Sequence, residues 1–193
     1  MNFNKPMFNI VFLLGTSGSG KSYLANALDG LTINNKNFRK LIQVTTRKRR
    51  DEEIGKPETE TYRFITEKEY NDYYKNNLIA KIEHYSGGKY GTLLPNEIEM
   101  NDDNIFLVIV NKDGLNDALN TLKSKDTLFD YLLVIIHTKD ENDIRDNRDK
   151  NKELDEINEI KYIYNDDYIL EIVKGEYNVI NIGKDIAKKL FII

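Results

Sequence analysis

Residues 15–22, with the sequence GTSGSGKS, have the types and spacing of a phosphate-binding loop. The glycines allow successive backbone N–H groups to turn inward around a diphosphate, and a following helix presents its positive amino end to the same anion. Lys21 can reach the outer phosphates, and the Ser22 hydroxyl can ligate Mg²⁺. We therefore predict a nucleotide phosphate site here, the alternative being a structural glycine turn. The residues expected to contact the nucleotide are Gly15, Ser17, Gly18, Ser19, Gly20, Lys21 and Ser22.

A run of four cations at 47–50 (RKRR) could bind a second phosphate. Arginine suits this task because its planar fork of N–H donors matches phosphate oxygens. Taken alone, the run could also be a nucleic-acid patch or a solvated edge of the fold, and without the neighbouring motifs the solvated edge is the favoured interpretation. Its function therefore depends on the motifs around it.

The composition limits the other kinds of chemistry. Without cysteine, the chain has no disulfide, thiol nucleophile or cysteine metal site. A zinc site on His84 and His137 would need carboxylates gathered from elsewhere, so we expect these to be packing or surface histidines. The 28 basic and 32 acidic residues leave a net charge of −4, so no global field favours nucleic acid, and we do not expect it as a partner. Apolar runs of about seven residues are too short to cross a bilayer, so we expect a soluble, cytoplasmic protein.

The elements that must position these residues alternate between strands and helices. The apolar run at 8–14 predicts a strand before the loop, and the spacing of leucines at 21–28 predicts a helix after it. Residues 105–110 and 131–136 are apolar on both faces, as in central parallel strands that helices cover on each side. We predict one α/β domain, residues 1–193: a parallel sheet with helices on both faces and the ligand at the carboxyl ends of the strands.

Local patterns predict the remaining elements. The sequence TEKE at 66–69 is a capping box that opens a helix ending near 76 or 77. Apolar residues at helical spacing predict one long helix over 154–172, after which Gly175 ends it. Four strands are expected at 38–46, 61–65, 78–85 and 177–182, and two more helices at 114–123 and 184–190.

Three motifs together resemble guanylate kinases: the loop at 15–22, the segment VTTRKRRDEE at 44–53 and the segment SGGKYGT at 86–92. Their order and spacing match over most of the chain. Because that family transfers the γ-phosphoryl of ATP to GMP, the resemblance implies ATP and Mg²⁺ as cofactors and small-molecule nucleotides as partners. It places Arg47, Arg50, Tyr62 and Tyr90 on the acceptor phosphate, Glu53 as a brace for the arginines, Thr92 beside the acceptor and Asn181 beside ATP.

The resemblance also implies a division of the chain. A small mixed α+β subdomain over 39–95 would bind the acceptor, and a mobile helical lid over 138–165 would place Arg145 and Arg148 over the transferring group. The core would comprise 1–38, 96–137 and 166–193. We expect no membrane partner, and either a monomer or a homodimer.

The positions at which this chain departs from the family pattern are mainly those that recognise the base. Gln43 stands where a serine is usual, and Lys81 where an acid is usual, with Glu83 about 7 Å further along the same strand face. Val108 and Val110 stand where acids order the Mg²⁺ shell and read the guanine amino group. Unpaired donors on a bound guanine cost about 1–3 kcal/mol each, so GMP specificity is the weakest part of the resemblance.

Our leading hypothesis is an ATP-dependent kinase that acts on GMP or on another small phosphorylated acceptor. The rival is a guanylate-kinase-like module that binds a protein or a nucleotide without catalysis. The missing acids motivate the rival, as does Ile160-Lys161, where the family usually has another arginine. A phosphate-loop hydrolase is a third hypothesis.

Overall fold

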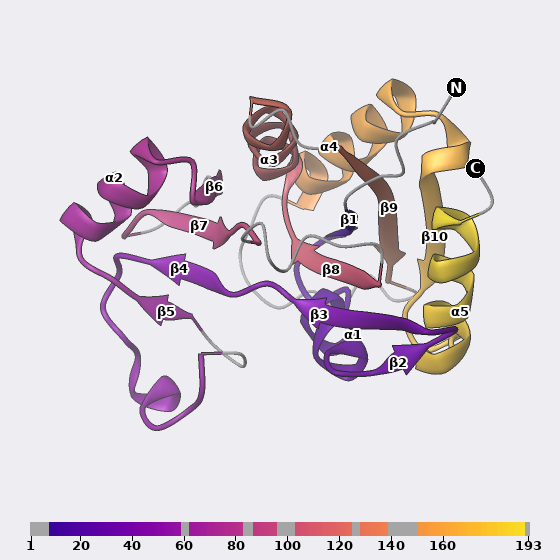
Figure 1. The fold of residues 1–193 in the computed structure, drawn as a ribbon, viewed down its shortest axis with the longest axis horizontal. Coiled ribbons are helices and arrows are strands. Elements are labelled where there is room, and N and C mark those ends of the chain that lie inside the picture. Colours follow the sequence, from indigo (N-terminus) through magenta and orange to yellow (C-terminus); the bar gives the residue numbers. More distant parts are fainter. Residues whose placement is uncertain are drawn as a thin grey trace. The chain divides into compact units, whose positions relative to one another are not determined.

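The computed structural model describes residues 8–58, 62–82, 87–95, 103–124, 128–138 and 150–191 (Figure 1). The chain forms two compact units. The P-loop unit comprises Met1–Lys40, Asn101–Lys112 and Leu128–Ile193, and the second unit comprises Leu41–Met100 and Asp113–Thr127. Each unit has its own sheet, and each is described by itself.

The P-loop unit is built on a six-stranded sheet with the order β10-β9-β1-β8-β3-β2. Its strands are β1 (Phe8–Leu14), β2 (Thr32–Ile33), β3 (Lys36–Lys40), β8 (Asn104–Ile109), β9 (Phe129–His137) and β10 (Ile169–Val173). β1 pairs in parallel with both β8 and β9, and all seven of its residues are buried. β2 and β3 are antiparallel and turn at Asn34 and Asn35, whose positive φ angles of 53° and 61° suit a tight hairpin.

Helices cover both faces of this sheet. On one face, α1 (Lys21–Leu28) and α5 (Val179–Leu190) pack their leucines and isoleucines against the sheet in one hydrophobic cluster. On the other face lie the aromatic rings of β1, β8 and β9, and Tyr131 stacks against Tyr168 and meets Tyr164 edge to face. Tyr164 directly follows α4 (Lys150–Ile163), whose Ile157 and Ile160 are buried. Figure 1 shows α4 across the sheet from α1 and α5. The predicted α/β fold class is confirmed.

The second unit is a four-stranded sheet with the order β5-β4-β7-β6. Its elements are β4 (Gln43–Thr45), the 3₁₀ turn Asp51–Glu53, β5 (Arg63–Phe64), α2 (Glu67–Lys75), β6 (Ile79–Ile82) and β7 (Tyr90–Leu93), with most of α3 (Lys112–Ser124). Val44, Tyr70 and Ile79 form its buried cluster. The predicted capping box is present, because the Thr66 hydroxyl accepts from Glu69 N–H and the Glu69 carboxylate accepts from Thr66 N–H.

Two predictions at the carboxyl end are wrong. The expected helix over 154–172 ends at Ile163, and its last part is the strand β10. The expected strand over 177–182 is absent, and α5 begins at Val179, because the Asn178 side chain accepts hydrogen bonds from Ile180 N–H and Asn181 N–H and so caps a helix there.

A third prediction, a single strand over 38–46, is also wrong. The segment is divided between β3 of the P-loop unit and β4 of the second unit. The expected strand at 8–14 and helix at 21–28 have the predicted bounds, and the other expected strands and helices are present with shifted ends. Residue 61 of the strand expected at 61–65 and residues 83–85 of the strand expected at 78–85 lie outside the described part.

Candidate functional site

The predicted phosphate loop connects β1 to α1 and has the backbone that such a loop requires. Gly15, Gly18 and Gly20 have φ angles of 147°, 81° and 97°, which favour glycine. At Gly15 space is a second constraint, since an added Cβ would lie 2.5 Å from Ile136 O. The loop is therefore held closely against the carboxyl end of β9, as expected for a ligand site on a parallel sheet.

The two loop side chains with predicted roles lie at the start of α1. Lys21 Nζ donates to the carbonyl oxygens of Gly15 at 2.7 Å and Thr16 at 2.8 Å, so the side chain folds back over its own loop. Ser22 is exposed. A hydroxyl in this position fits Mg²⁺, which commonly takes one or two protein oxygens and completes its shell with phosphate and water. Among the described residues, no group of three carboxylates or histidines could hold a metal.

A carboxylate from α4 reaches this loop. Glu153 Oε2 accepts a hydrogen bond from Ser17 N–H at 2.8 Å across 136 residues of sequence. This contact places an anionic oxygen on one of the loop amides, and nothing in the sequence indicated it.

The turn between β10 and α5 also lies beside the loop. A Cβ at Gly20 would lie 3.7 Å from the Tyr177 hydroxyl and 3.8 Å from Lys174 Cγ. Burial raises the pKa of Tyr177. Neither Lys174 nor Tyr177 was predicted to lie beside the loop, because the sequence pattern indicated no turn between a strand and a helix at this point. Asn181, the remaining predicted ATP contact, is exposed in the first turn of α5.

In the second unit, Arg47 is the centre of a preorganised cluster. Its Nη1 and Nη2 donate to Glu53 at 2.7 Å and 2.5 Å, in the bidentate geometry that a guanidinium and a carboxylate favour. Glu53 also accepts from Arg50 N–H at 2.8 Å. The bonds from Arg47 are the main reason why the pKa of Glu53 falls from 4.5 to about 2, and the same contact raises the pKa of Arg47.

Aromatic rings hold the Arg47 guanidinium from another side. Its Cζ lies 5.1 Å from the ring centre of Tyr62 and 5.2 Å from that of Phe64, within the range of a cation–π contact. Tyr62 in turn meets the buried Tyr90 edge to face, with ring centres 5.6 Å apart. The guanidinium is therefore fixed by a carboxylate and two rings. We call Arg47, Glu53, Tyr62 and Phe64 the Arg47 clamp.

The backbone around Gly88 closes on the clamp. An added Cβ at Gly88 would lie 2.7 Å from Arg47 N and 2.9 Å from Arg47 Cβ, so this position requires glycine. Next to it, Lys89 N–H donates to the Thr46 hydroxyl at 2.9 Å, and Lys89 O accepts from Thr46 N–H at 3.0 Å. Gly88 and Lys89 of the SGGKYGT segment are thus held against the chain that leads from β4 into the arginines.

The predicted acceptor arginines differ in exposure. The Arg47 side chain is only 10% exposed, whereas Arg50 is exposed. Arg145 and Arg148, the two predicted lid arginines, lie outside the described residues.

The positions that depart from the family pattern are arranged by the strand register. Gln43 pairs with Thr92 across β4 and β7, and Ala80 pairs with Thr92 from the other side, so these three residues share a face. Thr92 is buried, and its hydroxyl has no hydrogen-bond partner within the described part of the chain. Lys81 pairs with Gly91 and so belongs to the opposite face; its backbone N–H donates to Asp117 of α3 at 2.5 Å.

The acids expected near the metal have no counterpart at the two valine positions. Val108 and Val110 are 1% and 5% exposed, and they belong to the core. At these two positions, buried apolar side chains therefore stand where the family pattern has acidic ones.

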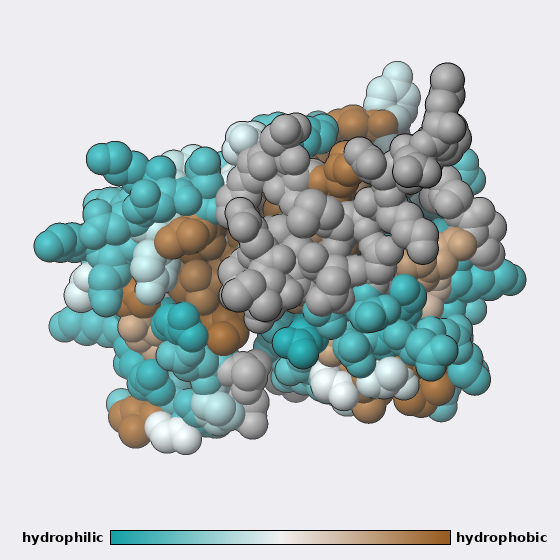
Figure 2. Space-filling model, in the orientation of Figure 1, coloured by the Kyte–Doolittle hydropathy of each residue, from teal (hydrophilic) through white to brown (hydrophobic). Residues whose placement is uncertain are grey.

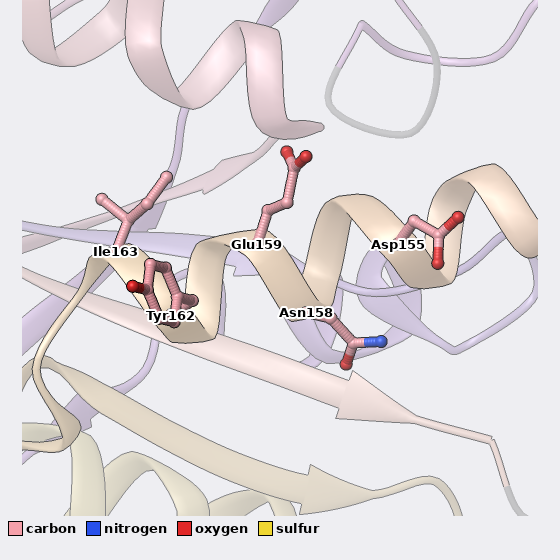
Figure 3. A pocket seen from close by; sticks show the side chains of 5 residues that line it. All are labelled: Asp155, Asn158, Glu159, Tyr162 and Ile163. Atoms are coloured by element: carbon pink, nitrogen blue, oxygen red, sulfur yellow. The ribbon is translucent and has the colours of Figure 1, made fainter.

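A groove of about 480 Å³ follows the surface of α4 and contains none of the predicted site residues (Figure 3). It is lined by Asp155, Asn158, Glu159, Tyr162 and Ile163. The visible surface of the described residues is mainly hydrophilic, with smaller apolar areas between (Figure 2). None of the helices in the described ranges has the length and apolarity needed to cross a membrane.

A glycine-rich loop between a central parallel strand and a helix, in a sheet covered on both faces, defines a P-loop nucleotide-binding protein. The family model for guanylate kinase matches residues 7–162, and the chain belongs to this family. Among solved structures, it is similar to guanylate kinase from Anaplasma phagocytophilum, with 21% identity, a TM-score of 0.62, and coverage of 96% of this chain and 86% of that chain. That likeness shows the fold. A search of curated proteins found no match.

Proposed function

We propose that the protein is a nucleoside monophosphate kinase that transfers the γ-phosphoryl of ATP to GMP or to a related small phosphorylated acceptor. The Arg47 clamp is the observation that carries the proposal. A phosphate loop alone would suit a nucleotide hydrolase equally well. A second anion site with a fixed guanidinium is what transfer between two phosphorylated molecules requires.

On the donor side, the loop amides and Lys21 would hold the ATP phosphates. Lys21 Nζ would exchange the carbonyls of Gly15 and Thr16 for phosphate oxygens. Mg²⁺, held in part by the Ser22 hydroxyl, would neutralise charge on the outer phosphates when bound. The roles of Asn181 toward ATP and of Arg145 and Arg148 over the transferring group remain predictions from the resemblance.

On the acceptor side, Arg47 would present its remaining N–H donors to the monophosphate, and the exposed Arg50 would add a second fork. Glu53 keeps Arg47 in place, and Tyr62 and Tyr90 would offer their hydroxyls to the same phosphate. The Thr92 hydroxyl, buried on the face that also carries Gln43, would contact the acceptor base.

The proposal is tested by incubating the full chain with ATP, Mg²⁺ and a panel of nucleoside monophosphates and measuring ADP and the phosphorylated product. We expect transfer to at least one acceptor, and we expect Lys21→Ala to abolish it without lowering the thermal unfolding midpoint. Lys184→Ala, which removes an exposed lysine from α5, is the matched control and should retain activity. Normal turnover in Lys21→Ala would refute the donor assignment. Nucleotide binding without transfer to any acceptor would favour a binding module instead.

A further inference from the structure

The carboxylate of Glu153 occupies a position in the phosphate loop that suits a phosphate oxygen. Its Oε2 accepts from Ser17 N–H at 2.8 Å, and Ser17 is the central residue of the GTSGS turn. Loop amides of this kind bind anions because their N–H groups converge near the positive end of a helix. A carboxylate oxygen on such an amide is a charged acceptor of the same kind as a phosphate oxygen.

The helix that carries Glu153 is held by contacts that do not involve the loop. Ile157 and Ile160 are 7% and 2% exposed, so the middle of α4 is docked. Lys161 Nζ pairs with Glu171 of β10 at 2.9 Å, and Lys112 pairs with Glu159. Glu153 lies in the first turn of α4, away from the buried middle of the helix, so releasing the loop would require only rotation of this one side chain.

We propose that Glu153 is a latch that competes with the nucleotide for the phosphate loop. A bound triphosphate needs the loop amides, and it is repelled by a carboxylate among them, so nucleotide binding displaces Glu153. The latch weakens nucleotide binding by about three- to tenfold, the effect of one charge-assisted hydrogen bond on an amide that the ligand also uses. This inference rests on the proposed ATP site.

The test measures binding rather than turnover. Isothermal titration calorimetry of the full chain with ADP and Mg²⁺ would compare the wild type with Glu153→Ala. The matched control is Asp155→Ala, which removes one negative charge from the same turn of α4 at an exposed position in the groove. We expect Glu153→Ala to tighten ADP binding by about three- to tenfold and Asp155→Ala to change it by less than about twofold.

Two further measurements separate the latch from other effects. Pyrophosphate binding should tighten in Glu153→Ala as ADP binding does, whereas adenosine binding should not change, because adenosine has no phosphate for the loop. Glu153→Gln removes the charge and keeps the shape, so it should give a smaller gain in the same direction even if the alanine variant folds poorly.

The outcomes are distinct. ADP binding that is unchanged or weaker in folded Glu153→Ala and Glu153→Gln would overturn the latch and leave the ATP site intact. Equal tightening in Asp155→Ala would also overturn it, because a general charge effect would then suffice. ADP binding by none of the proteins would overturn both the latch and the proposed function. Binding by the Glu153 variants alone would support the latch strongly.

Discussion

Replacing Glu53 by glutamine tests whether the Arg47 clamp is a real structural unit. The substitution keeps the shape of the side chain but removes the charge that holds Arg47 through bonds of 2.7 Å and 2.5 Å. It also turns one acceptor into an NH₂ group that faces the guanidinium. We expect the second unit to lose stability at neutral pH and the acceptor KM to rise.

The expected loss of unfolding free energy can be worked out from the pKa of Glu53. A fall from 4.5 to about 2 corresponds to an upper limit of about 3.4 kcal/mol of stabilisation by the ionised form. Of this limit we expect about 1–2 kcal/mol to be lost in Glu53→Gln at pH 7, because the glutamine carbonyl can still accept a hydrogen bond from Arg47, whose side chain is only 10% exposed. The folded-state pKa is the lower one, so this stabilisation is fully present above pH 4.5 and is lost as the pH falls through about 2.

The assay is urea unfolding followed by circular dichroism over a series of pH values from 7 to 2, with hydrogen exchange at Arg50 N–H as a local measure. The wild type should lose stability relative to Glu53→Gln between pH 4.5 and about 2, so that the two converge in acid. Glu52→Gln, at an exposed position in the same 3₁₀ turn, is the matched control. A difference between Glu53→Gln and the wild type that stays constant across this range would refute the reasoning.

Two further predictions concern the same cluster. Arg50→Ala should raise the acceptor KM or lower kcat by about tenfold with little change in ATP affinity, since Glu53 bonds to the Arg50 backbone and remains in place; unchanged acceptor kinetics would show that the cation run is only surface. Gly88→Ala should destabilise the second unit by about 1–3 kcal/mol in thermal or urea unfolding, because its Cβ would lie 2.7 Å from Arg47 N. Gly87→Ala, where no atom lies within 4 Å of an added Cβ, isolates the cost of a positive φ angle; an equal loss in both variants would contradict the steric argument.

The strand, the glycine-rich loop and the helix over residues 8–28 could be predicted because their signals are local. The strand β1 and the helix α1 begin and end where the apolar pattern places them, and the loop between them needs particular residue types at adjacent positions. The capping box at Thr66 is equally local, since both of its hydrogen bonds close within three residues.

The carboxyl end was predicted wrongly because short apolar segments do not distinguish a strand from a helix. Ile160, Tyr164, Tyr168 and Ile172 keep helical spacing although only the first lies in α4. The break is marked by Asn165-Asp166-Asp167, a sequence that favours turns. Contacts such as the one between Glu153 and Ser17 could not be predicted at all, because they depend on how α4 packs on the sheet.

Residues that bind a phosphate are easier to predict from sequence than residues that bind a base. A phosphate is bound by backbone amides and one arginine fork, which need only short motifs. A base is bound by side chains on several strands, so the register decides which residues can act together. Here the register pairs Thr92 with both Gln43 and Ala80 and leaves Lys81 on the other face. In our proposal the change from an acid to Lys81 thus carries less weight for the base than the change from serine to Gln43, because Gln43 shares a face with the buried Thr92 and a glutamine amide can both donate and accept. A site of that kind does not require guanine, and this is why the acceptor panel must extend beyond GMP.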